Sequence, residues 1–360
     1  MVFLHGTAHE FIVDPWLFCE ASMSFRKKDR YIVAVADATD AVMKELLEIL
    51  EERRFPVEEL LLFGEEQSAG EKIDFQGKKR VVSRLSKESF LGADIAFLSL
   101  SSQPGKDYAR IAVASGCKVI DVSGSFRGDQ DASLVVPEIH AAAFSDRSGI
   151  ICNPSVSAIA LCLALKPIQD AVGVTRIVAT TFQSVSGMGR KGIDELAGQT
   201  VALLNFKDIE PKLYSHQIAF NCIPHVSEFH DFGSTREETE IIHEVRNILS
   251  DDSIQINLTA VRIPVFRCDS YSVYVETRKA VSANEVRAVL SEAPGIMVYD
   301  DPQKNLYPTP IEVAGKDELY IGRIRQDESV PNGVNLWMVL DNLRKGSALN
   351  AVQIAEKLIC

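Results

Sequence analysis

Hydrophobic and polar positions in residues 25–152 follow two alternating patterns. Apolar runs typical of buried strands lie at 31–37, 57–63, 93–100 and 117–124. Between them, apolar residues recur at helical spacing, as at 42, 46, 47 and 50, and a second helix is expected over 106–115. A further pair of short strands at 68–82 suggests a hairpin. Strands that alternate with helices indicate a parallel sheet, so we expect a doubly wound, Rossmann-type α/β domain with ligands at the carboxyl ends of its strands.

The pattern changes after the Asn153-Pro154 corner. Residues 175–187 predict a strand that enters a Gly-rich loop, and 254–264 and 271–277 alternate as strands do. The segment 235–238 predicts a capping box that opens a helix, with Thr235 as the N-cap. We therefore expect an α+β domain over 153–340 with a mostly antiparallel sheet. Apolar spacing over 347–358 predicts a C-terminal helix, within a segment 341–360 that returns to the first domain.

Length, charge and cysteine usage narrow the class of protein. A chain of 360 residues favours two domains, and a net charge of -12 argues against nucleic-acid or anionic-membrane partners. Seven scattered cysteines without a Cys-x-x-Cys pair indicate reduced thiols. Residues 1–24 lack the basic start of a signal peptide, so we interpret them as an N-terminal extension, with Met23 as an alternative start. These features together predict a cytoplasmic protein.

Nine phrases, in the same order, resemble the aspartate-semialdehyde dehydrogenase family. They cover nearly all of 30–360 and lie at 54–63, 68–78, 118–127, 134–140, 182–196, 220–229, 261–266, 322–327 and 341–358. The resemblance implies a Rossmann-type nucleotide-binding domain, an α+β dimerisation domain and a homodimer. It also implies the family's reaction, the NADPH-dependent reduction of aspartyl phosphate to the semialdehyde, which proceeds through a cysteine thioester.

Two slots that the resemblance assigns to catalysis hold other residues here. A thioester needs a thiolate, which a helix N-terminus favours. The family's corner reads Asn-Pro-Asn-Cys-Ser, but this chain has Val156 in the cysteine slot. The family's histidine base falls on Asp269, and an unperturbed carboxyl with a pKa of about 4 is a weak base beside imidazole at about 6.5 unless it is desolvated. No catalytic residue is intact, and only Cys152 and Cys268 remain as alternative nucleophiles.

The slots that the resemblance assigns to the cofactor also differ. Where the family has the motif Gly-Ala-Thr-Gly-Ala-Val-Gly, this chain has Asp-Ala-Thr-Asp-Ala-Val-Met at 37–43. The loss of the glycines removes backbone freedom, and the two aspartates add negative charge near a pyrophosphate. A carboxylate about 4 Å from a phosphate charge, at an effective dielectric of about 20, weakens the binding free energy of the phosphate by roughly 4 kcal/mol. The degraded cofactor-binding slots are Thr39, Asp40, Ala41, Val42, Gln67, Ser68, Ser186, Gly187 and Asn342. We therefore expect no bound cofactor, and NADP if the chain is active.

The substrate-binding slots survive better. Arg127 matches the family's phosphate-binding arginine, Gln183 the glutamine that orients the acyl group, Arg262 the arginine that binds the substrate carboxylate, and Glu237 the carboxylate that faces the substrate amine. The lysine that follows this glutamate in the family is Glu240 here. Structural roles remain open, because Glu237 suits the first turn of a helix and both arginines suit salt bridges.

Two hypotheses follow. In the first, the chain is a non-catalytic family member that acts as a binding or partner protein, with a pocket for an anionic small molecule and a homodimer, or a heterodimer with an active homologue. In the second, it is a working NADP-dependent dehydrogenase that uses atypical residues. His225 and His230 have no neighbours in the sequence that complete a metal set, so no metal site is expected.

Overall fold

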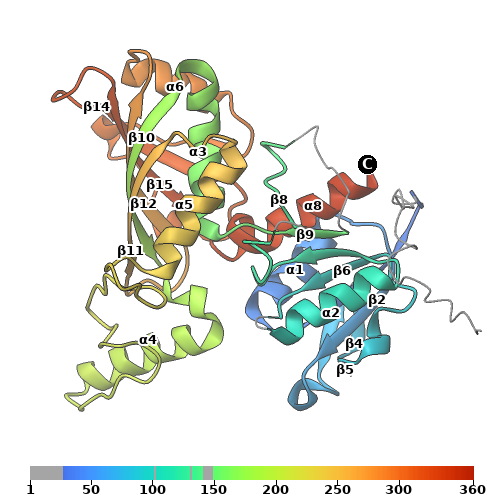
Figure 1. The fold of residues 1–360 in the computed structure, drawn as a ribbon. Coiled ribbons are helices and arrows are strands. Elements are labelled where there is room, and N and C mark those ends of the chain that lie inside the picture. The colour runs from blue at the N-terminus through green and yellow to red at the C-terminus, as the bar shows by residue number, and fades with distance from the viewer. Residues whose placement is uncertain (1–26, 101–102, 130–131, 141–148) are drawn as a thin grey trace, which may run out of the picture.

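The computed structural model describes residues 27–100, 103–129, 132–140 and 149–360, so the predicted extension at 1–24 lies outside the described residues. The first part of the chain forms a sheet in the order β5-β2-β1-β6-β7-β9-β8, in which every pair is parallel (Figure 1). This confirms the predicted Rossmann-type sheet. Its strands are β1 (Tyr31–Ala36), β2 (Val57–Gly64), β5 (Ser83–Arg84), β6 (Ile95–Leu98), β7 (Lys118–Asp121), β8 (Ser133–Leu134) and β9 (Ile150–Cys152).

Helices cover this sheet, and the predicted hairpin lies beside it. The hairpin strands pair antiparallel, as expected. The core on one face joins α1 and α8 through the buried side chains of Leu46, Leu50, Leu349 and Val352. The C-terminal helix therefore packs on the first sheet, although its chain arrives from the second. The elements are α1 (Ala41–Glu52), β3 (Lys72–Phe75), β4 (Lys78–Val81), α2 (Gln103–Ala114) and α8 (Leu349–Ile359), with short turns at Glu66–Ser68 and Lys87–Phe90.

The second sheet has the order β11-β10-β12-β15-β14-β13. Its three central pairs are antiparallel and its two outer pairs are parallel, so the α+β prediction is confirmed with a mixed sheet. The two predicted strands after residue 254 do not pair with each other, because β10 lies between them. The strands are β10 (Val174–Gln183), β11 (Gln255–Arg262), β12 (Asp269–Thr277), β13 (Ile296–Val298), β14 (Leu319–Gln326) and β15 (Gly333–Leu340).

The predicted Gly-rich loop contains a single turn of 3-10 helix, Val185–Met188, and is followed by the 16-residue helix α4 (Gly189–Leu204), which the sequence pattern did not predict. Glycine lowers helix propensity, which hides this helix in the sequence. Gly192 has a packing reason, because a Cβ there would lie 2.3 Å from the Val185 carbonyl oxygen. The strand and the loop after it were predicted, whereas α4 was missed because its glycines weaken the helical pattern.

One helix connects the two sheets. α3 (Val156–Val172) is buried along most of its length and belongs to the hydrophobic core that spans both sheets. It packs against α5 (Arg236–Leu249) and α6 (Ala283–Ser291) on the face of the second sheet nearest the first domain (Figure 1). The N-terminus of α3 therefore lies where the two domains meet. In the part of the chain that the structure describes, no helix is long and apolar enough to cross a bilayer.

Candidate functional site

The Asn-Pro corner lies at the carboxyl end of β9. Ser155 is the N-cap of α3, and its Oγ accepts a hydrogen bond from the Ala158 N–H at 3.3 Å. Val156 is therefore the first residue of the helix, as the pattern indicates. A Cβ on Gly346 would lie 2.5 Å from Val156 Cγ1, so the valine packs directly on the backbone of the π-helical turn Arg344–Ala348. The side chain at this helix N-terminus therefore carries methyl groups and no nucleophilic atom.

The buried thiols do not replace the missing nucleophile. Cys152, Cys162 and Cys268 are each 0% exposed. Burial raises the pKa of all three thiols, and nearby carboxylates such as Asp121 beside Cys152 raise it further. A reactive cysteine needs an accessible thiolate. The structure therefore contradicts the suggestion that Cys152 or Cys268 serves as an alternative nucleophile.

Asp269 has an unusual environment for a carboxylate. Its Oδ1 accepts hydrogen bonds from the backbone N–H of Ser184 at 2.7 Å and from the Ser184 hydroxyl at 2.9 Å. Burial nevertheless raises the pKa of Asp269 from 3.8 to about 6, although these hydrogen bonds and Arg262 oppose the shift. The desolvation that a useful base would need is thus present. The base slot holds a group that titrates near the pKa of imidazole.

Three of the predicted substrate residues lie together beside Asp269. Gln183 Nε2 donates to Glu237 Oε1 at 3.1 Å, which joins the end of β10 to the first turn of α5. Arg262 Nη1 donates to the Ser184 carbonyl oxygen at 2.6 Å. Among the described residues, no carboxylate forms an ion pair with Arg262, so the salt-bridge alternative for this arginine has no support.

Arg127 has a different partner. Its Nε lies 3.5 Å from the Asn153 carbonyl oxygen and 3.7 Å from Glu244 Oε1. Glu244 Oε2 accepts the Ser155 N–H at 2.6 Å, so this carboxylate also orders the start of α3. Sequence reasoning missed Glu244. The available signal was an acidic residue within the apolar face of α5, between Ile241 and Ile248.

The cofactor slots at the start of α1 are filled by the chain itself. Asp40 is the N-cap of α1, and its carboxylate accepts the Val42 N–H at 2.7 Å. Asp37 has a positive φ of 64°, and burial, together with Asp40 and Glu65, raises its pKa. An anion at this helix end would meet an occupied N–H and two carboxylates. These residues do not fit a pyrophosphate.

The other cofactor slots are bonded among themselves. Gln67 Nε2 donates to Glu65 Oε2 at 2.5 Å, and Ser68 Oγ donates to the Glu65 carbonyl oxygen at 3.0 Å. Asn342 Oδ1 accepts from the Ser186 hydroxyl at 3.1 Å and from the Cys268 N–H at 2.9 Å. Gly187 lies close to Arg262, because a Cβ there would lie 3.0 Å from Arg262 Nη1. Among the described residues, no three His, Cys, Asp or Glu side chains gather as a metal site.

The substitution Asp40→Asn keeps a side chain that can cap α1 and removes the negative charge of Asp40. Asparagine caps a helix as well as aspartate, so the free energy of unfolding is expected to stay within about 0.5 kcal/mol. Removal of the charge is expected to tighten NADP binding at least about fivefold, which corresponds to the roughly 1 kcal/mol of a unit-charge pair 4 Å apart in water. Isothermal titration and urea unfolding measure the two effects. Unchanged NADP affinity would show that Asp40 does not face the nucleotide.

Comparisons with known proteins cover both domains. Residues 32–147 match the family model for the semialdehyde dehydrogenase NAD binding domain, and residues 165–345 match that for the semialdehyde dehydrogenase dimerisation domain. The first match supports a nucleotide-binding domain and does not support the expectation that no cofactor binds. The carboxylates at the start of α1 therefore disfavour nucleotide binding, whereas the domain match favours it.

Full-length relatives agree with these matches. The aspartate-semialdehyde dehydrogenase of Aquifex aeolicus (strain VF5) is 45% identical over 91% of this chain and 98% of that protein. The enzyme of the same name from Legionella pneumophila is 46% identical over 91% and 95%. The structure of aspartate semialdehyde dehydrogenase II from Vibrio cholerae, complexed with ASA, is 44% identical with a TM-score of 0.89 over 92% of this chain and 99% of that one. The chain therefore belongs to the aspartate-semialdehyde dehydrogenase family.

Proposed function

We propose that this chain binds a small amino-acid ligand in the family's substrate site and forms no thioester. The observation that carries this proposal is Val156 at the N-terminus of α3, with its methyl group against Gly346 and every nearby thiol buried. A side chain without a lone pair cannot attack a carbonyl. Gln183 and Glu237 are hydrogen bonded to each other and Arg262 to the Ser184 carbonyl oxygen, and their carboxylate and guanidinium groups suit the amino and carboxylate groups of such a ligand.

The second candidate is a working NADP-dependent dehydrogenase, and specific observations favour it. The relatives named aspartate-semialdehyde dehydrogenase are 41–46% identical over nearly the whole chain, and the NAD binding domain is matched. The raised pKa of Asp269 supplies a base that titrates near neutrality. The similarity to these relatives favours this second candidate, whereas Val156 in the nucleophile slot favours the first. The matched dimerisation domain supports a homodimer under either candidate, and a mixed dimer with an active homologue is the further proposal.

A turnover assay separates the two candidates. The purified chain is mixed with aspartate semialdehyde, phosphate and NADP, and NADPH is followed by absorbance, with the Vibrio cholerae enzyme as the positive control. We expect no NADPH above background from this chain, because Val156 cannot form the thioester and the thiols of Cys152, Cys162 and Cys268 are buried. NADPH formation that is lost in a Cys152→Ser or Cys268→Ser variant would establish the dehydrogenase instead.

A further inference from the structure

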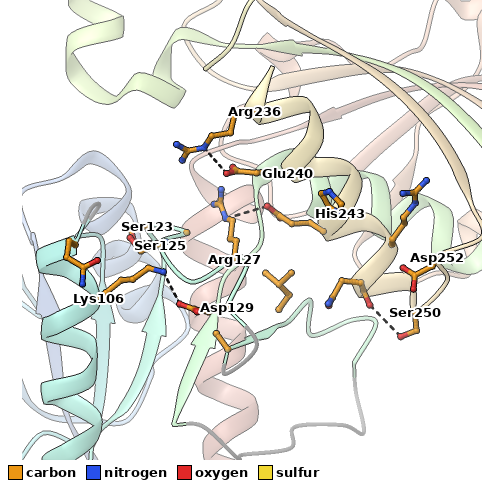
Figure 2. Close-up of a pocket in the computed structure, with 18 residues that line it drawn as sticks. Lys106, Ser123, Ser125, Arg127, Asp129, Arg236, Glu240, His243, Ser250 and Asp252 are labelled. Atoms are coloured by element: carbon orange, nitrogen blue, oxygen red, sulfur yellow. Dashed lines mark hydrogen bonds and ion pairs between the residues drawn. The ribbon is translucent and has the colours of Figure 1, made fainter. Parts of the chain in front are cut away.

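A cavity of about 1000 Å³ lies between the loop that follows β7 and one face of α5 (Figure 2). Arg127 and Glu244 line this cavity and also contact the Asn-Pro corner, through the Asn153 carbonyl oxygen and the Ser155 N–H. The charged residues that line it are Lys106, Arg127, Asp129, Arg236, Glu240, Glu244, Arg246 and Asp252. The cavity therefore adjoins the Asn-Pro corner through Arg127 and Glu244.

Glu244 presents an unused acceptor to this cavity. The residue is 2% exposed, and its Oε2 is already bonded to the Ser155 N–H. Its Oε1 accepts no hydrogen bond, and Arg127 Nε, at 3.7 Å, is too distant to donate one. A buried carboxylate oxygen without a donor is costly. This oxygen therefore points to a ligand that brings an N–H or O–H donor.

Most other charged groups in the cavity have partners. Lys106 is paired with Asp129 at 2.8 Å, as Figure 2 shows. Arg236 is paired with Glu240 at 2.8 Å. By contrast, the terminal nitrogens of Arg127 donate no hydrogen bond to any described residue. Arg127 and Glu244 form a long ion pair with each other at 3.7 Å, which leaves the terminal nitrogens of Arg127 and Oε1 of Glu244 without hydrogen bonds among the described residues.

The charge balance of the cavity disfavours phosphate. Its described lining has four side chains of each sign, Lys106, Arg127, Arg236 and Arg246 against Asp129, Glu240, Glu244 and Asp252. A dianion would find no excess of positive charge there. It would also face Glu240, which stands where the family has a lysine. A neutral group that both accepts and donates hydrogen bonds meets neither penalty.

We infer that this cavity binds the primary carboxamide of a small amino-acid ligand, and not a phosphate. The carboxamide oxygen accepts from Arg127, and its NH₂ group donates to Glu244 Oε1. The inference rests on the proposed function, since the ligand's amino and carboxylate groups are assigned to Glu237 and Arg262. Glu237 and Glu244 lie seven residues apart on α5, so the two carboxylates share one face of the helix about two turns apart.

Isothermal titration with L-asparagine, L-aspartate and inorganic phosphate tests the inference on the full chain. We expect L-asparagine to bind at least about tenfold more tightly than L-aspartate, and no measurable binding of phosphate. Glu244→Gln places a donor where the acceptor stood and is expected to weaken L-asparagine binding at least about tenfold, the effect of losing a hydrogen bond to a charged group. Glu240→Lys is expected to gain phosphate binding, and Glu292→Lys, an exposed charge reversal at the end of α6, is the matched control.

Several results would overturn the inference. They are an absence of L-asparagine binding, equal or tighter binding of L-aspartate or phosphate, or unchanged L-asparagine affinity in Glu244→Gln. If that variant fails to fold by circular dichroism, the ligand preference of the native chain and the Glu240→Lys result still decide. Turnover in the NADPH assay would defeat the proposed function, whereas these binding preferences test the carboxamide separately.

Discussion

Lys345→Ala is expected to lower the free energy of unfolding by about 3–5 kcal/mol, the usual cost of removing one partner from a buried ion pair. Lys345 is 0% exposed, and its Nζ donates to Glu138 Oε2 at 2.8 Å, Asn350 Oδ1 at 3.0 Å and Gln353 Oε1 at 2.6 Å. The substitution leaves the Glu138 carboxylate and two amide oxygens without their donor. Urea unfolding of the native and variant proteins measures the loss.

The effect is expected to extend to the Asn-Pro corner. Asn350 Nδ2 donates to Asn153 Oδ1 at 2.7 Å, so the network around Lys345 holds the residue that begins the corner. The double variant Lys345→Met with Glu138→Gln removes both charges and is expected to be more stable than Lys345→Ala. A loss below about 1 kcal/mol in Lys345→Ala would show that water replaces the ammonium and that the network is not a buried one.

Asp269→Asn is expected to stabilise the protein increasingly as the pH rises from 4 to 7. The pKa of Asp269 is raised by burial from 3.8 to about 6. Well below pH 3.8 the carboxyl is protonated in both the folded and the unfolded state. Between pH 4 and 6 only the unfolded chain releases the proton, so the native protein loses stability as the pH rises through this window.

Asparagine has no proton to lose, and its side-chain oxygen still accepts the Ser184 hydrogen bonds. The stability of Asp269→Asn relative to the native protein is therefore expected to rise by about 2–2.5 kcal/mol between pH 4 and pH 7, at about 1.4 kcal/mol per pKa unit. Urea unfolding at pH 4 and pH 7 measures the change. Asp251→Asn should show the opposite sign, because hydrogen bonds from Ser253 lower the pKa of Asp251. A pH-independent difference for Asp269→Asn would rule out the raised pKa.

The pattern of the chain was enough for the architecture. Buried parallel strands read as continuous apolar runs, and the capping box at Thr235 is confirmed by both of its hydrogen bonds. The pattern did not predict α4, because its three glycines weaken the helical signal. Glycine propensity is a weak local preference of about 1 kcal/mol, and packing around Gly192 outweighs it.

Some properties of the candidate site likewise follow from the sequence, and others depend on the tertiary structure. The absence of a thiol at Val156 and the presence of Asp40 and Glu240 are covalent facts, so the sequence alone determined which chemical groups are missing. The accessibility of Cys152 and Cys268, the pKa of Asp269 near 6 and the unpaired oxygen of Glu244 were decided only by the tertiary structure. These properties depend on how much water is removed from a group and on charges far away in the chain, which no local pattern contains.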